Sequence, residues 1–356
     1  MFSNNLKTSG IMFALMSAFL FGVSTPLAKY LLIEIEPLIL AGLLYLGSGI
    51  GIGIILIAKI ILAKPNSMEK INYQDFKWLL LTTLLGGIIA PILLMQGLVL
   101  TNASTASLLL NLESIFTALI AWLVLKEHTS LNLILGMIFI VAGSIILASS
   151  SHFSGPNVIG MILVVAACLA WGADNNITRQ ISSSNPYIIV CFKSLVAGSI
   201  NVLLGLYFTK KILLTTPTIF KALSIGFLSY GISLVCFVLA LRNIGTARTS
   251  AYFSSAPFIG AILSVTFLSE PLTFRLLFAC LFMAAGVWIH LTERHDHEHA
   301  HDELTHEHLH FHDEHHQHKH LSSDPQGEPH SHLHHHKSIK HKHPHYPDIH
   351  HRHKHS

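Results

Sequence analysis

Histidine is the residue type with the clearest chemistry in this chain. Residues 293–356 contain 24 of the 27 histidines, most of them in a His-x-His alternation. Alternate side chains of an extended segment share one face, so neighbouring imidazoles lie roughly 7 Å apart. Neutral imidazole suits transition metals, and the lack of Cys and Met here argues against Cu⁺. We therefore predict that this segment binds zinc, nickel or cobalt. The predicted ligands are His295, His297, His299, His301, His306, His308, His310, His312, His315, His316, His318 and His320.

The charge of residues 293–356 suggests a second interpretation, a pH-responsive polycation. The segment has 7 Lys and Arg against 11 Asp and Glu, which gives a net charge of −4 with neutral histidine. Below the histidine pKa of about 6.5 this charge would rise toward +20. Both interpretations can hold together. Because the segment has few aliphatic residues, it is predicted to be disordered on its own. We call residues 293–356 the histidine tail.

Glu113 is the second residue that could do chemistry. It lies in the middle of an apolar run, where a carboxylate costs ~3 kcal/mol on insertion scales. Such a residue is a plausible proton carrier or cation-pairing group in a transport cycle, although it could simply pair with Lys193 and lock two helices together. Lys193 could instead extend to the headgroups. Asp174, Asn175 and Asn176 are expected at a helix end near water.

Small polar residues accompany Glu113 at helical spacing. Two such stripes are expected to face one another, either lining a cavity or allowing close helix packing. Prolines interrupt three of the apolar runs, and such breaks are either gate elements or packing features. The first stripe is Ser107, Asn111, Ser114 and Ala118, and the second is Ser250, Ser254, Pro257 and Ala261. The three prolines are Pro26, Pro91 and Pro257.

The elements that position these residues are membrane-spanning helices. The chain has 51% hydrophobic and 12% charged residues, far from the ~25% charged share of soluble proteins. Since a bilayer core needs about 20 apolar residues in helix, ten spans are predicted. They are residues 11–32, 38–62, 78–99, 103–125, 131–149, 158–176, 187–208, 220–241, 249–268 and 272–292. The loops on one side carry ten Lys and Arg against five on the other, which predicts that both termini are cytoplasmic.

An internal repeat divides the spans into two halves. Gly10 and Gly22 fall on Gly160 and Gly172 at an offset of 150, and span four matches span nine at an offset of 143. Because each half has an odd number of spans, the second half must enter the membrane from the opposite side. We therefore predict an all-α polytopic membrane protein of two inverted five-helix repeats, 1–150 and 151–292, followed by the histidine tail.

The stretches Thr105–Glu127 and Thr249–Glu270 resemble the EamA branch of the drug/metabolite transporter superfamily, and the resemblance covers residues 9–292. It implies secondary active transport of small solutes. It also implies a central cavity from which spans five and ten are largely excluded. The family pattern usually has a proline in span four, where this chain has Glu113 or Ser114, while span nine keeps Pro257.

These observations predict a secondary active transporter, most simply an exporter, rather than an enzyme. The chain has no GxxxxGK[ST], GxSxG or HExxH motif, and its four cysteines show no CxxC spacing. The alternative is a membrane-anchored metal-binding or sensing protein without transport activity.

The expected partners are the lipid bilayer, a small-molecule or ion substrate and divalent transition metals. No required cofactor and no nucleic acid are expected, and a homodimer is left open. The short loops and the charge bias suggest a bacterial inner membrane.

Overall fold

The computed structural model describes the chain except for residues 1, 63–74, 127–130, 150–155, 182–183, 210–213, 245, 293–295, 302–303, 311–329, 337–338 and 345–356. Residues 8–293 form one compact unit of packed helices. The first half contains α1 (Phe2–Leu31), α2 (Pro37–Leu62), α3 (Phe76–Thr82), the π-helix η2 (Thr83–Ile89), α4 (Ala90–Leu100), α5 (Ala103–Leu109), α6 (Leu112–Leu123) and α7 (Leu131–Ala148).

The second half repeats this order. It contains α8 (Pro156–Ile181), α9 (Pro186–Phe208), α10 (Thr216–Gly226), the π-helix η3 (Phe227–Ile232), α11 (Ser233–Ile244), α12 (Thr246–Phe253), α13 (Ala256–Phe267) and α14 (Phe274–Thr292). Local signals set several helix starts. Asn185, for example, accepts a hydrogen bond from the Tyr187 amide at 3.0 Å and precedes Pro186, which fits the first helical turn.

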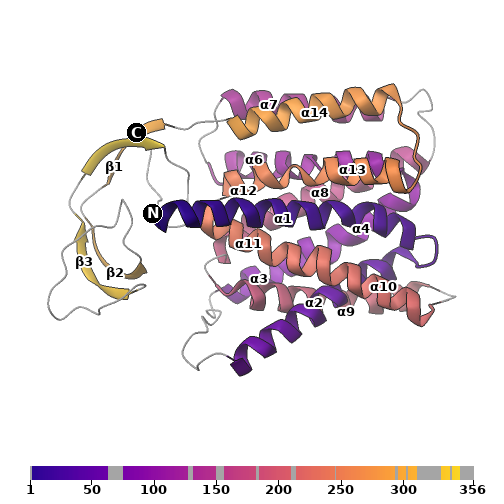
Figure 1. The fold of residues 1–356 in the computed structure, drawn as a ribbon, viewed down its shortest axis with the longest axis horizontal. Helices are drawn as coiled ribbons and strands as arrows, with labels where there is room; N and C mark the ends of the chain where they lie inside the picture. Colours follow the sequence, from indigo (N-terminus) through magenta and orange to yellow (C-terminus); the bar gives the residue numbers. More distant parts are fainter. Residues whose placement is uncertain are drawn as a thin grey trace. The chain divides into compact units, whose positions relative to one another are not determined.

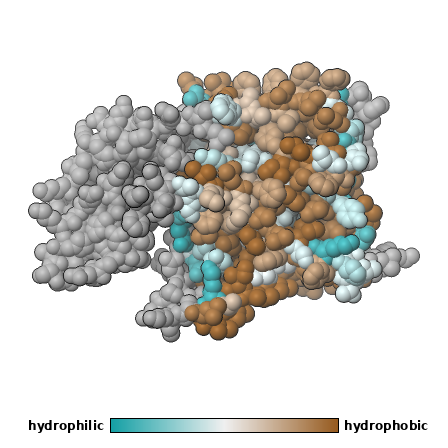
Figure 2. Space-filling view, in the orientation of Figure 1, coloured by the Kyte–Doolittle hydropathy of each residue, from teal (hydrophilic) through white to brown (hydrophobic). Residues whose placement is uncertain are grey.

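The predicted spans are confirmed as apolar helices. In the described residues nine helices are long and apolar enough to cross a bilayer, and the tenth predicted span is the shorter apolar helix Phe274–Ile289. The surface of these helices is largely hydrophobic (Figure 2), and large apolar side chains such as Ile54, Leu203 and Leu281 are exposed on it. This surface fits hydrocarbon, since lipid leaves a helix to satisfy its own backbone groups. The first span starts and the last one ends at the same end of the bundle (Figure 1).

The helix irregularities follow the internal repeat. The π-helices η2 and η3 begin at Thr83 and Phe227, and a turn interrupts span four at 110–111 and span nine at 254–255. Gly22 of α1 lies so close to α13 that a Cβ there would be 2.5 Å from the Ala256 carbonyl oxygen. Gly172 of α8 makes the equivalent approach to α6, 2.7 Å from Phe116 Cβ. The repeat is therefore visible as matched contacts as well as matched residues.

The prolines explain only part of these irregularities. Pro91 follows η2 and Pro257 follows the turn in span nine, as predicted. The prediction for span one was wrong, because α1 continues through Pro26. The turn in span four has no proline near it.

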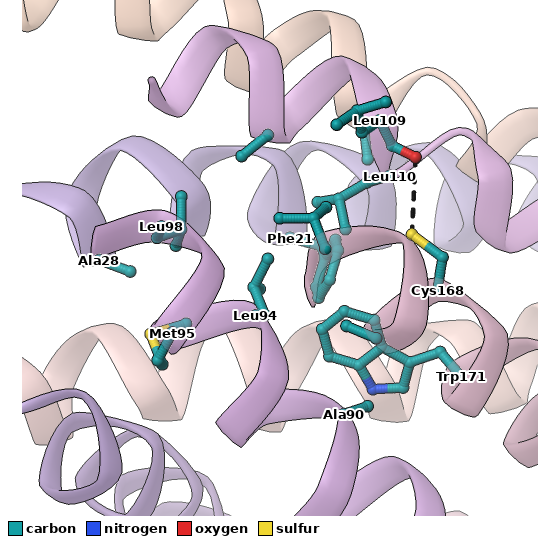
Figure 3. Packing of buried hydrophobic residues seen from close by; sticks show 14 of the residues in the cluster. Phe21, Ala28, Ala90, Leu94, Met95, Leu98, Leu109, Leu110, Cys168 and Trp171 are labelled. Atoms are coloured by element: carbon teal, nitrogen blue, oxygen red, sulfur yellow. Dashed lines mark hydrogen bonds between the residues drawn. The ribbon is translucent and has the colours of Figure 1, made fainter. Parts of the chain in front are cut away.

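Helices of the first half pack against helices of the second half. The span pairs α2 with α9 and α7 with α14 pack closely, as do α4 with α8 and α5 with α13. Buried side chains of both halves form one main core. Figure 3 shows part of it, where Phe21 and Trp171 lie close together and Cys168 Sγ donates a 3.5 Å hydrogen bond to the Leu109 carbonyl oxygen. The two halves thus share one core.

In the histidine tail the described residues are four strands, in a unit of their own with residues 1–7. Strand β1 (Asp296–His301) pairs antiparallel with β4 (Ile339–Pro344), and β2 (Leu304–His310) with β3 (His330–His336). The composition of this segment predicts disorder and no strands. The His-x-His alternation has the period of two that an extended strand requires, which is the physical basis for this difference.

Candidate functional site

A narrow pocket lies between the two halves, and both predicted stripes contribute to it. It is bounded by the interrupted parts of spans four and nine, together with α1, α8 and α11. Neither α7 nor α14 supplies a lining residue in the described part of the chain, as the resemblance implied for spans five and ten. The lining residues are Phe21, Leu110, Asn111, Glu113, Ser114, Thr117, Asn175, Phe237, Ser250, Phe253, Ser254 and Pro257.

Glu113 lies in the first turn of α6, directly after the turn that breaks span four. Its carboxylate Oε1 accepts a hydrogen bond from Asn175 Nδ2 of α8 at 2.8 Å. The same amide group lies 3.3 Å from Thr117 Oγ1, one turn further along α6. The carboxylate is thus fixed at the contact between the first half and the second.

Another part of the pocket lining comes from the break in span nine. Ser254 lies in that turn, its hydroxyl donates to the Ser250 carbonyl oxygen at 2.9 Å, and Pro257 lies at the start of α13. Ser114 similarly donates to the Asn111 carbonyl oxygen at 2.7 Å. Each of these hydroxyls donates its proton to a nearby backbone carbonyl oxygen and can still accept a hydrogen bond.

Six of the eight predicted substrate or coupling residues line this pocket. They are Asn111, Glu113, Ser114, Ser250, Ser254 and Pro257. Ser107 lies outside it, fully buried in the contact between α5 and α13 beside Gly260. Lys193 also lies outside it.

The expected surroundings of Lys193 and Asp174 were wrong. Lys193 does not extend to the headgroups, because its residue is only 5% exposed and its Nζ lies 2.5 Å from Asp174 Oδ2. Asp174 is equally buried, so it does not face water at a helix end. Each charge has the other as its partner, as buried charges generally require. Glu113 is therefore paired with Asn175 and not with Lys193.

The ion pair packs against the π-helix of span three. A side chain at Gly86 would collide with the Asp174 carboxylate, and Ala197 and Lys193 of α9 lie beside Gly87. The Gly86 carbonyl oxygen accepts hydrogen bonds from Tyr45 Oη at 2.6 Å and from Trp171 Nε1 at 3.1 Å. These side chains compensate for the irregular backbone within the spanning region.

Half of the pocket lining was not predicted from the sequence. Asn175 was expected near water, and Thr117 and Leu110 lie beside predicted residues without having been selected. The three phenylalanines, Phe21, Phe237 and Phe253, gave no signal, because pocket-lining and lipid-facing phenylalanines look alike in an apolar span. Only the position of Asn175 beside Asp174 and Asn176, within a hydrophobic helix, could have marked it as unusual.

The metal prediction lies largely beyond the described side chains. His295, His312, His315, His316, His318 and His320 lie outside the described residues. Another six lie on β1 or β2, and their side chains are outside the described part of the chain: His297, His299, His301, His306, His308 and His310. Among the residues with described side chains, no group of three or more His, Cys, Asp or Glu could hold a metal ion.

Comparison with known proteins agrees with this architecture. The EamA-like transporter family matches residues 8–149 and again residues 158–292, once for each half. The chain belongs to this family. It is accordingly a multi-pass membrane transporter and not an enzyme.

Two relatives and one solved structure illustrate the likeness. An uncharacterized transporter of Methanothermobacter thermautotrophicus is 30% identical over 76% of this chain and 82% of its own length. The uncharacterized transporter YvbV of Bacillus subtilis is 24% identical over 77% of this chain and 90% of its own length. A solved crystal structure superposes with a TM-score of 0.62, covering 80% of this chain and 98% of the other, at 16% identity. That structure shares the fold.

Proposed function

We propose that the protein is a secondary active transporter that binds its solute in the pocket between spans four and nine and couples movement to Glu113. The observation that carries this proposal is the position of Glu113. It lies at a helix break of the first half, in a pocket that is also lined by the equivalent break of the second half. Inverted repeats with broken helices at a shared site are the arrangement that alternating access uses.

The pocket is chemically asymmetric although the halves are related. At the repeat offsets Glu113 falls on Ala256, and Asp174 falls on Ser24. Among its described lining residues the pocket therefore has one carboxylate instead of a matched pair. A single intramembrane carboxylate is expensive in lipid and is typical of an ion or proton pathway.

Flux measurements on the full-length protein in proteoliposomes test this proposal. A panel of labelled amines, amino acids, organic acids and divalent metals would be applied with and without a proton gradient. Glu113→Gln should reduce the flux of the transported solute by about tenfold or more, in the range expected for losing a charged hydrogen-bond acceptor. Glu36→Gln, which changes an exposed carboxylate in the α1–α2 loop, is the matched control. Equal flux in wild type and Glu113→Gln would overturn the coupling role.

We further propose that the histidine tail binds transition metals at the membrane surface. Its histidine content supports this, and so does the strand register, which sets His299 opposite His341 and His308 opposite His332. Metal binding without any flux would favour the alternative of a membrane-anchored sensor. Equilibrium dialysis of zinc, nickel and cobalt with the full chain and with a chain lacking residues 293–356 is the appropriate measurement.

The membrane and direction are further parts of the proposal. The loop charge bias supports cytoplasmic termini in a bacterial inner membrane, and outward transport would give a cytoplasmic metal-binding tail a role in export or its regulation. Labelling of a tag at each terminus in intact cells and in inverted vesicles tests the orientation. Size-exclusion chromatography with light scattering tests for a homodimer.

A further inference from the structure

The pocket has a carboxyl group with no positively charged side chain beside it among the described lining residues. Glu113 is the one ionisable residue among the described lining residues. The nearby charges, Asp174 and Lys193, are already joined in a 2.5 Å ion pair, which leaves neither free for a ligand. In a surrounding of low dielectric constant, a carboxyl group either binds a cation or holds its proton.

Asn111, which lines the pocket, has a side-chain acceptor without a hydrogen-bond partner in the described part of the chain. Asn111 is 1% exposed, and its Oδ1 makes no hydrogen bond within the described residues. Its Nδ2 donates to the Leu108 carbonyl oxygen at 3.2 Å, which fixes the amide with the oxygen as the unpaired atom. A buried acceptor without a partner costs about 1–3 kcal/mol, so it indicates a ligand that supplies a donor.

Aromatic rings form the remaining wall of the pocket. The ring centroid of Phe253 lies 5.3 Å from that of Phe21 and 5.0 Å from that of Phe237. Leu110 and Pro257 add further apolar surface. Ring faces attract cations, and the rings also offer contact area for a hydrocarbon group.

We propose that the substrates are small protonated primary amines that carry an apolar or aromatic group. The ammonium would bind the Glu113 carboxylate and donate a second hydrogen bond to Asn111 Oδ1. The apolar group would pack against the three phenylalanines. This rests on the proposed function and adds the class of solute. The proposed substrate class excludes anions, because the described lining residues include no positive charge to pair with one. It disfavours quaternary ammonium ions, which have no N–H group for Asn111.

Isothermal titration of the purified full-length protein with 2-phenylethylamine tests the proposal. The matched probes are 2-phenylethanol, which has no charge, and N,N,N-trimethyl-2-phenylethylammonium, which keeps the charge and has no N–H donor. The primary amine should bind about tenfold or more tightly than either analogue, or 1.4 kcal/mol. Glu113→Gln should reduce its affinity by about tenfold or more, and Asn111→Leu should remove the preference for the primary over the quaternary amine. Glu36→Gln should leave the affinity unchanged.

Several results would overturn this substrate class. They are absence of amine binding to the wild type, equal binding of the alcohol, or equal affinities of wild type and Glu113→Gln. A fluorescence size-exclusion profile of each variant identifies misfolding, and the analogue comparison needs the wild type alone. The proposed function is judged separately by the solute panel. Glu113-dependent flux of another solute would keep the transporter proposal and reject the amine.

Discussion

Asn175 Nδ2 donates a 2.8 Å hydrogen bond to Glu113 Oε1, and this bond joins α8 of the second half to α6 of the first. Inverted halves must move relative to one another in alternating access, so a bond across them at the pocket is sensitive to that motion. Glu113 is therefore both a candidate ligand and part of the contact between the halves.

We expect Asn175→Ala to reduce Glu113-dependent flux by about tenfold, since a hydrogen bond to a charged group contributes about 1.5–3 kcal/mol. Asn175→Asp should be worse than Asn175→Ala, because it places a second carboxylate beside the first. Both variants would be measured in proteoliposomes at equal protein density. Flux in Asn175→Asp at or above the Asn175→Ala level would contradict this role of Asn175.

The ion pair of Asp174 and Lys193 should be structural. Removing one partner leaves a buried uncompensated charge, which costs about 3–5 kcal/mol, whereas removing both is often nearly neutral. Asp174→Asn and Lys193→Met should each lower the melting temperature in detergent, and the double variant should recover most of the loss. If the melting temperature of the double variant fell by the sum of the two single losses, an uncompensated buried charge would not explain those losses.

A close helix contact gives a prediction with a control on the same helix. In α2, a side chain at Gly47 would overlap the Leu223 backbone of α10, whereas at Gly53 the nearest described atom, Cys191 Sγ, is 3.4 Å away. Gly47→Ala should destabilise the protein by about 1–3 kcal/mol through forced separation of the helices. Gly53→Ala should be neutral or slightly stabilising, as expected from helix propensity. The measurement is thermal unfolding monitored by circular dichroism. An equal change in melting temperature for the two variants would contradict the close contact at Gly47.

Deletion of residues 293–356 should abolish high-capacity binding of zinc and nickel and leave the helical fold intact. Binding by the full chain should weaken as the pH falls below about 6.5, because protonated imidazole cannot ligate a metal. Equilibrium dialysis at two pH values gives both results. An unchanged metal stoichiometry after deletion would refute the assignment of the tail.

The spans and repeat could be predicted because their causes are local. A run of about 20 apolar residues crosses a bilayer wherever it lies in the chain, and Gly22 and Gly172 keep their spacing because both permit the same close approach. Glu113 was equally visible, since a carboxylate in an apolar run is costly.

Partners across helices could not be predicted in the same way. Lys193 was assigned to Glu113 or to the headgroups, but its ion pair with Asp174 depends on how α8 rotates against α9. The phenylalanine wall depends on the same rotations. Residue type reveals that a polar group needs a partner, while helix packing decides which partner it has.

Alternating access is best tested by the accessibility of the pocket from the two faces of the membrane. Ser254, buried in the pocket wall, would be replaced by Cys in a chain whose four native cysteines are changed to serine or alanine and which retains flux. A small membrane-impermeant methanethiosulfonate would be added to intact cells and to inverted vesicles. Alternating access should give labelling from both faces, with protection by the transported solute. Labelling from one face alone, with or without solute, would contradict a passage that opens alternately between the two halves.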